Sequence, residues 1–183
     1  ALLAQHGVSN PAVDANTLHG LTWGAAADRV KAVHPELASV DVASAMMRGF
    51  AEILDASGLT LVPGADDFVV GLHGRFRLGL YTSNVRSEVQ RLKREYPAFQ
   101  VLETVVSGED VRHSKPHPEG YLRLAEQLGV EPESCVVFED SVAGLKSARS
   151  AGMQTVGVIH PGTQGLVESL ADRTISDYSE LLR

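Results

Sequence analysis

The sequence is poor in cysteine and has no long hydrophobic run. Its single cysteine, Cys135, cannot form an internal disulfide. Cys135 opens an apolar stretch, which favours a buried structural thiol over a reactive one. No stretch is apolar over the length that a bilayer span needs, and there is no signal peptide. We therefore expect a cytoplasmic protein.

Positive charge is also scarce. The chain has 16 Lys and Arg against 23 Asp and Glu, a formal net charge of -7. This balance argues against a general nucleic-acid binder and against a protein that binds an anionic membrane surface. Walker, GxGxxG and GxSxG motifs are missing, and the histidines lack the HExxH spacing of a zinc site. We expect a monomer or weak dimer.

The hydrophobic residues, 44% of the chain, follow two different patterns. Residues 1–60 space them three and four apart, as helices do, in 22–33 and 41–58. From residue 61 helices and strands alternate, which predicts a Rossmann-like parallel sheet covered by helices. We expect helices over 62–74, 86–96, 118–130 and 141–153, strands over 76–84, 101–106, 134–140 and 154–160, and a short strand and a terminal helix within 171–183.

Polar side chains stand where two of these strands end, and parallel sheets bind ligands at that edge. Thr82, Ser83 and Asn84 close one strand and either cap the next helix or donate hydrogen bonds to a phosphoryl oxygen. Glu139 and Asp140 close another. They are either a capped, solvated turn or the holders of Mg²⁺, with one acid reaching the metal and the other supporting it.

A lysine lies in a loop that proline keeps out of a helix. Lys115 stands in "HSKPHP", where Pro116 biases it toward extended backbone. A lysine held in such a loop can offset the charge of a phosphate or carboxylate. The alternative is a solvated surface lysine, and the residue alone does not decide between them.

The order of these pieces resembles the haloacid dehalogenase-like hydrolases. "LGLYTSN" is similar to the second motif of that family, "HSKPHPEGY" to its third and "VVFEDSVAGLKSARSAGM" to its fourth. The resemblance implies that Thr82 and Lys115 are catalytic, that Asp140 binds Mg²⁺, and that Glu139 stands beside it in the metal site. Ser83 and Asn84 would then bind the phosphorylated substrate.

The resemblance also implies a division of the chain. Residues 1–60 would be most of a helical cap, preceded by the end of a linker helix, and residues 61–183 the α/β core. "TLHGLTWGAAADRV" resembles the part of the cap that faces the substrate, with His19 and Trp23 as candidates, although Trp23 could equally be a packing residue. The stretch is most similar to that of the sugar- and polyol-phosphate phosphatases.

The first motif of the family, DxDGT, is missing from the sequence. It carries the nucleophilic aspartate, so the resemblance implies that this residue and the first core strand precede residue 1. The function expected is a Mg²⁺-dependent phosphatase of a small phosphorylated metabolite, acting through a phospho-aspartate. Two alternatives stay open: a β-phosphoglucomutase-like phosphosugar mutase, and a chain without the nucleophile that only binds a ligand.

Overall fold

The first two α-helices of the described part of the chain pack on each other. The computed structural model describes residues 13–14, 17–160 and 164–182. Helix α2 (Trp23–Val33) begins where the Thr22 side chain accepts from the Ala25 N–H, and α3 (Val42–Ser57) begins at the Asp41 cap. Helix α3 ends at Gly58, whose φ of +69° suits glycine. A 3₁₀ turn (Pro35–Leu37) joins the two helices, which bury a small apolar cluster made of Ala27, Val30, Leu37 and Val42.

The rest of the chain alternates strands and helices, and every strand pair is parallel. Strand β1 (Gly79–Tyr81) pairs with β2 (Thr104–Val106), with Gly79 opposite Thr104. A second sheet has the order β3-β4-β5, formed by β3 (Val136–Glu139), β4 (Gln154–Val158) and β5 (Arg173–Ile175). The predicted α/β architecture with parallel strands is confirmed.

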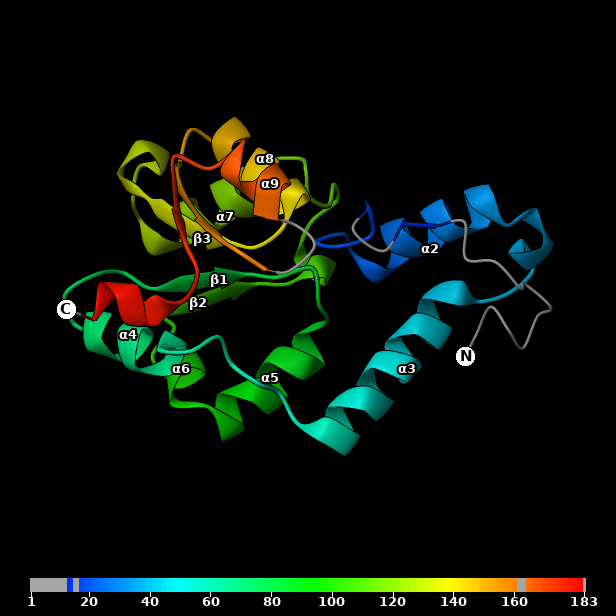
Figure 1. Ribbon diagram of the computed structural model, residues 1–183, viewed down its shortest axis with the longest axis horizontal. Coiled ribbons are helices and arrows are strands. Elements are labelled where there is room, and N and C mark those ends of the chain that lie inside the picture. The colour runs from blue at the N-terminus through cyan, green and yellow to red at the C-terminus, as the bar shows by residue number, and fades with distance from the viewer. Residues whose placement is uncertain (1–12, 15–16, 161–163, 183) are drawn as a thin grey trace.

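Helices cover the strands from both sides (Figure 1). Helix α7 packs on β1 and β2, and α8 packs on β3 and β4 around a core that includes Leu124, Leu128 and Ala148. In the described part of the chain, no helix combines the length and the apolar character needed to cross a membrane. The helices of this half are α4 (Ala65–Leu72), α5 (Arg86–Glu95), α6 (Pro97–Gln100), α7 (Glu119–Leu128), α8 (Val142–Ser150) and α9 (Gln164–Glu168), with 3₁₀ turns at Gly108–Asp110, Pro132–Ser134 and Tyr178–Leu181.

Several elements differ from the sequence-based prediction. The strand expected over residues 76–84 is ordered as a strand only at Gly79–Tyr81, because only these residues pair with β2. The terminal helix is a single 3₁₀ turn capped by Asp177. Helices α6 and α9 were not predicted, since each is about one turn long and too short to show a helical period. The domain boundary at residue 60 stays a prediction.

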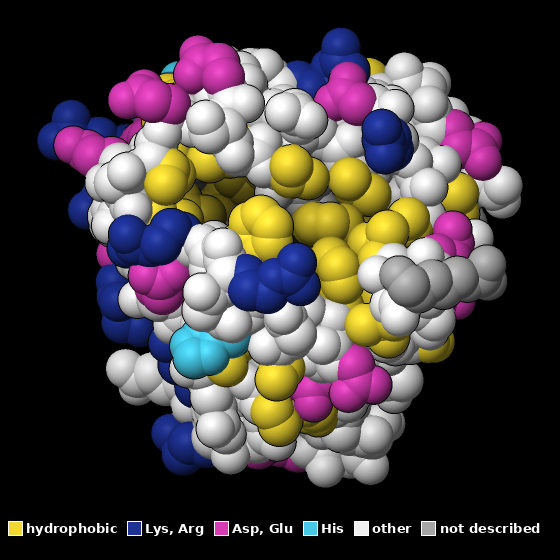
Figure 2. All heavy atoms as spheres, turned by 90° about the vertical axis from the view of Figure 1, so that its left-hand side faces the viewer, with side chains coloured by type: hydrophobic (Ala, Val, Ile, Leu, Met, Phe, Trp, Pro, Cys, Tyr) yellow, Lys and Arg dark blue, Asp and Glu magenta, His cyan; other side chains and the backbone are white. Residues whose placement is uncertain are grey.

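The sheet is divided in two. Among the described residues, no strand pairs with the second edge of β1 or with the second edge of β3. Between these edges lies a cleft of about 810 Å³, lined mainly by apolar side chains of residues 78–81, 136–138, α4 and α7. Figure 2 faces a hollow rimmed by hydrophobic side chains on this side of the molecule. Within the described residues, both strand edges therefore face this apolar cleft.

Candidate active site

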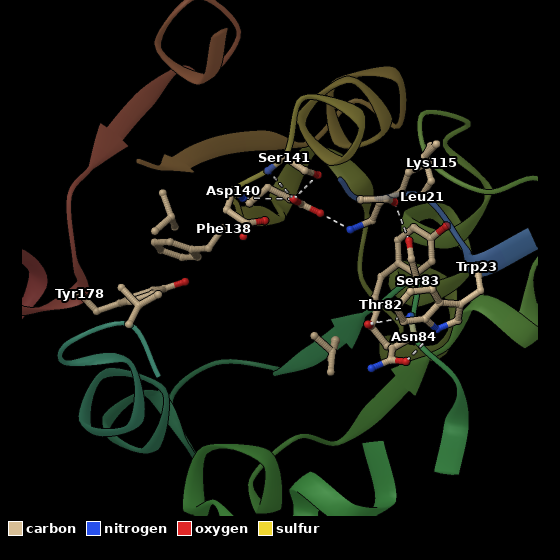
Figure 3. A pocket seen from close by; sticks show the side chains of 16 residues that line it. Leu21, Trp23, Thr82, Ser83, Asn84, Lys115, Phe138, Asp140, Ser141 and Tyr178 are labelled. Atoms are coloured by element: carbon tan, nitrogen blue, oxygen red, sulfur yellow. Dashed lines mark hydrogen bonds and ion pairs between the residues drawn. The ribbon is translucent and has the colours of Figure 1, made fainter. Parts of the chain in front are cut away.

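The carboxyl ends of β1 and β3 open into one pocket of about 400 Å³. The chain direction explains this, because parallel strands end at the same edge of the fold. Figure 3 shows side chains from both sheets and from the segment before α2 facing the same space. Seven of the eight predicted site residues line the pocket: Trp23, Thr82, Ser83, Asn84, Lys115, Glu139 and Asp140. The eighth, His19, lies next to Asp140.

Glu139 points into the protein and is fully engaged there. Its carboxylate accepts hydrogen bonds from the Lys115 ammonium, from the Tyr121 hydroxyl at 2.9 Å and from the Ser141 hydroxyl at 2.9 Å. The backbone N–H groups of Asp140 and Ser141 also point at it. Burial alone would raise the pKa of the Glu139 carboxyl, but the charge and hydrogen bond of Lys115, with those of Ser141 and Tyr121, outweigh burial and lower it.

Gly144, in the first turn of α8, makes room for this carboxylate. A Cβ at that position would lie 2.0 Å from the Glu139 carboxyl carbon and from Oε1. The close neighbour of this glycine is therefore the acid itself.

Lys115 is held at the wall of the pocket by charge and by two aromatic rings. Its side chain is 6% exposed and pairs with Glu139. The ammonium nitrogen lies 4.9 Å from the centre of the Tyr81 ring and 5.5 Å from that of Tyr121. The alternative of a solvated surface lysine is therefore wrong. The ammonium has a fixed position from which it can meet an anion in the pocket.

Asp140 points away from Glu139, as the alternation of side chains along a strand predicts. Its carboxylate is 52% exposed, and the partner found for it among the described residues is His19, with Nε2 at 3.6 Å. A half-exposed carboxylate at the edge of a pocket is a donor of the kind that Mg²⁺ uses, with waters filling the other positions. Asp140 is therefore suited to bind a Mg²⁺ ion. The Glu139 oxygens already accept several hydrogen bonds, so Glu139 would contribute to such a site by holding Lys115 in position.

Two of the three polar residues after β1 bond to residues 20–23. The Ser83 hydroxyl donates to the Gly20 carbonyl at 2.6 Å, and the Asn84 side-chain oxygen accepts from Trp23 Nε1 at 3.2 Å. The Thr82 oxygen accepts from the Asn84 N–H at 3.1 Å, so its own proton is left to donate toward the pocket. Ser83 and Asn84 thus bind residues 20–23, which sequence reasoning did not foresee, and their predicted contact with the substrate stays a prediction.

Trp23 has both a polar and an apolar contact. Besides its bond to Asn84, its ring packs on Phe50 of α3, with ring centroids 5.5 Å apart. The packing role that the sequence left open is present, and Trp23 also lines the pocket.

Sequence reasoning missed three residues of the site. Tyr121 and Ser141 bind Glu139, and Tyr178 points into the pocket from the C-terminal 3₁₀ turn (Figure 3). Burial, with Asp140 and Glu139 nearby, raises the pKa of Tyr178 to about 12, so its hydroxyl stays protonated at neutral pH. Tyr178 lies in no motif, and only the fold brings the C-terminal turn to this edge.

The order and geometry of these groups agree with the comparison to known proteins. Residues 13–152 match the haloacid dehalogenase-like hydrolase family. The chain belongs to this family. The predicted family membership is confirmed. Thr82, Lys115 and Asp140 line one pocket, and the roles assigned to them stay predictions.

Individual relatives carry phosphatase and mutase names. The chain is 34% identical over 143 residues to Protein CbbY of Rhodobacter capsulatus, covering 76% of this chain and 63% of that protein. It is 33% identical over 145 residues to validoxylamine A 7'-phosphate phosphatase of Streptomyces hygroscopicus subsp. limoneus, covering 78% and 67%. The fold is similar to that of β-phosphoglucomutase from Clostridium difficile, with a TM-score of 0.78, 19% identity and coverage of 98% and 83%. The chain thus spans about two thirds of the length of these curated relatives.

Proposed function

We propose that the protein is a Mg²⁺-dependent phosphatase of a small phosphorylated metabolite, most simply a sugar or polyol phosphate. The observation that carries this proposal is the meeting of a fixed cation, Lys115, and a half-exposed carboxylate, Asp140, in one pocket of about 400 Å³. Family membership and the phosphatase name of the Streptomyces relative support the same reaction. The cytoplasmic location and the monomeric or weakly dimeric state expected from the sequence belong to this proposal.

Each pocket residue has a chemical role in the proposal. Lys115 binds a phosphoryl oxygen with its ammonium, and Glu139 keeps that ammonium at the pocket wall. The Thr82 hydroxyl donates to a second phosphoryl oxygen. Asp140 holds Mg²⁺, which neutralises phosphoryl charge when bound. The segment from His19 to Trp23 closes one side of the pocket and excludes water from it.

The nucleophile is proposed to be an aspartate upstream of residue 1 that becomes a phospho-aspartate. The acids that line the pocket within the described residues are Glu139 and Asp140, and the first is committed to Lys115. The cleft between β1 and β3 supports this proposal, because a strand paired with both edges would end at the same pocket. Such a strand would also cover the apolar lining of the cleft.

A phosphosugar mutase is the second candidate. The similarity of fold to β-phosphoglucomutase favours it, and the core residues would be the same. Of the two candidates before and at the start of α2, His19 lies 3.6 Å from Asp140 and Trp23 Nε1 bonds to Asn84, so both are already engaged within the protein. We therefore place hydrolysis first.

The test uses the protein together with the coding sequence that precedes residue 1. Phosphate release from a panel of sugar and polyol phosphates is measured with and without Mg²⁺, alongside bisphosphate-dependent isomerisation. The proposal expects Mg²⁺-dependent phosphate release that Asp140→Asn and Lys115→Met each lower by at least about 100-fold. Lys146→Met is the matched control, since Lys146 is exposed on the surface of α8. Hydrolysis that survives both pocket substitutions would refute the roles, and isomerisation without phosphate release would select the mutase.

A further inference from the structure

A second group of metal-ligating side chains lies outside the pocket, on the loop that carries Lys115. The group consists of His113, His117 and Glu119, and one ligand atom of each lies within 4.8 Å of the others. The two imidazole rings have centroids 4.6 Å apart, and His113 Nδ1 is 2.9 Å from a Glu119 carboxylate oxygen. None of the three lines the pocket, so the proposed phosphatase chemistry does not use them.

The carboxylate of this cluster is held in position by the backbone. Glu119 begins α7, and its two oxygens accept from the N–H groups of Arg112 at 2.8 Å and His113 at 3.0 Å. The Arg112 N–H and the bonds from His113 lower the pKa of Glu119 to about 2. The group is therefore an anion at neutral pH and is already oriented toward the histidines.

The cluster is open to solvent. The His113 side chain is 64% exposed, that of Glu119 is 25% exposed, and His117 is also exposed. A tetrahedral ion with bonds of about 2.0–2.2 Å needs ligand atoms about 3.3 Å apart. Small rotations of exposed side chains bring the atoms to this spacing, and water completes the coordination. The hydrogen bonds that the ion replaces, from His113 to Glu119 and from the Glu119 N–H to His117 Nδ1, both lie at the surface.

We propose that His113, His117 and Glu119 form a surface site for a borderline divalent transition ion such as Zn²⁺. Two imidazole nitrogens and one carboxylate oxygen are the donor set that such ions take, whereas Mg²⁺ prefers oxygen alone. The ion would join the two ends of the segment 113–119, which contains Lys115 and Pro116. It would therefore brace the loop that positions the pocket ammonium, and this role does not depend on the proposed reaction.

Co²⁺ is the probe, because tetrahedral Co²⁺ absorbs visible light and takes the same donors. The chain is titrated with Co²⁺ in excess Mg²⁺, which occupies oxygen-only sites. The proposal expects one Co²⁺ per chain, a visible absorption band and displacement by Zn²⁺. Since loss of an outer partner of a metal ligand already costs 10–100-fold in affinity, His113→Gln and His117→Gln should each weaken binding at least about tenfold. Glu119→Gln keeps the size of the side chain and should do the same.

Two controls separate this site from others on the chain. His73→Gln changes an exposed histidine outside the cluster and should leave the affinity unchanged. Asp140→Asn should also leave it unchanged, because Asp140 lies in the pocket. Circular dichroism confirms that each variant is folded. The proposal is overturned if the chain takes up no stoichiometric Co²⁺, if both histidine variants bind it as tightly as wild type, or if Asp140→Asn is the variant that loses it.

Discussion

Replacing Lys115 by methionine should destabilise the protein by about 3 kcal/mol at pH 7 and by much less in acid. The substitution keeps the length and apolar stem of the side chain but leaves Glu139 buried without its cation. Removal of one partner of a buried pair costs about 3–5 kcal/mol. Glu139 keeps hydrogen bonds from Tyr121 and Ser141, which places the cost at the lower end.

The pH dependence follows from the state of the Glu139 carboxyl. Without Lys115, the buried Glu139 carboxylate has no cation beside it, and the folded protein therefore takes up a proton on this group. At pH 7 this costs about 3.4 kcal/mol, since the ordinary pKa is 4.5 and each pH unit is worth about 1.36 kcal/mol. The cost falls to about 0.7 kcal/mol at pH 5. In the wild type, folding lowers the pKa of Glu139. The stabilisation by the ionised Glu139 is therefore present above pH 4.5 and is lost as the pH falls through the pKa of this group in the folded protein.

Urea denaturation followed by circular dichroism at pH 7, 6 and 5 measures both effects. For a chain of this size the loss at pH 7 corresponds to a drop in Tm on the order of 10 °C. Lys146→Met is again the control and should change the free energy of unfolding by less than about 0.5 kcal/mol. The argument is refuted if Lys115→Met behaves like this control at pH 7, or if its deficit does not shrink between pH 7 and pH 5.

Three further predictions concern neighbours of this pair. Gly144→Ala should lower the free energy of unfolding by about 1–3 kcal/mol, because the new Cβ meets a carboxylate that cannot move away. The control is Gly49→Ala in α3, whose Cβ meets nothing within 4 Å and which should stabilise the protein by up to about 1 kcal/mol. Thermal denaturation compares the two variants. Asn84→Ala removes the acceptor of Trp23 Nε1, so the emission of the single tryptophan should shift and become easier to quench with iodide, while the surface change Gln90→Ala leaves it unaltered. Asp140→Asn should tighten binding of inorganic phosphate in the absence of Mg²⁺ and remove the effect of Mg²⁺ on that binding, both measured by calorimetry; unchanged phosphate affinity would contradict the charge argument.

The sequence was sufficient to predict that the candidate residues lie together, because they follow the ends of strands. Thr82 and Asp140 follow short apolar strands, and the topology of a parallel sheet brings such ends together wherever they stand in the chain. The divergence of Glu139 and Asp140 was also predictable, since neighbours on a strand face opposite ways. Local rules therefore predicted which strand ends share an edge, whereas the roles of the residues rest on the family resemblance and stay predictions.

Long-range contacts were not predictable in the same way. Tyr178 reaches the pocket only because the last 3₁₀ turn packs beside α4, and nothing in "SDYSELL" marks it as a pocket residue. The bonds from Trp23 to Asn84 and from Ser83 to Gly20 join residues more than 60 positions apart. Polar side chains that a sequence motif assigns to a ligand can equally bind another segment of the chain.

The charges of the pocket explain why a cation is part of the proposed function. Lys115 and Glu139 form a buried pair whose charges cancel, so Lys115 alone cannot offset an incoming phosphoryl dianion. Asp140 then leaves the lining with a net negative charge. The Asp140 carboxylate would repel a phosphoryl group unless a divalent ion lay between the two. Asp140 is half-exposed, so it can supply one carboxylate ligand to such an ion. In the proposed function, Asp140 is thus the residue that would make phosphate binding conditional on Mg²⁺.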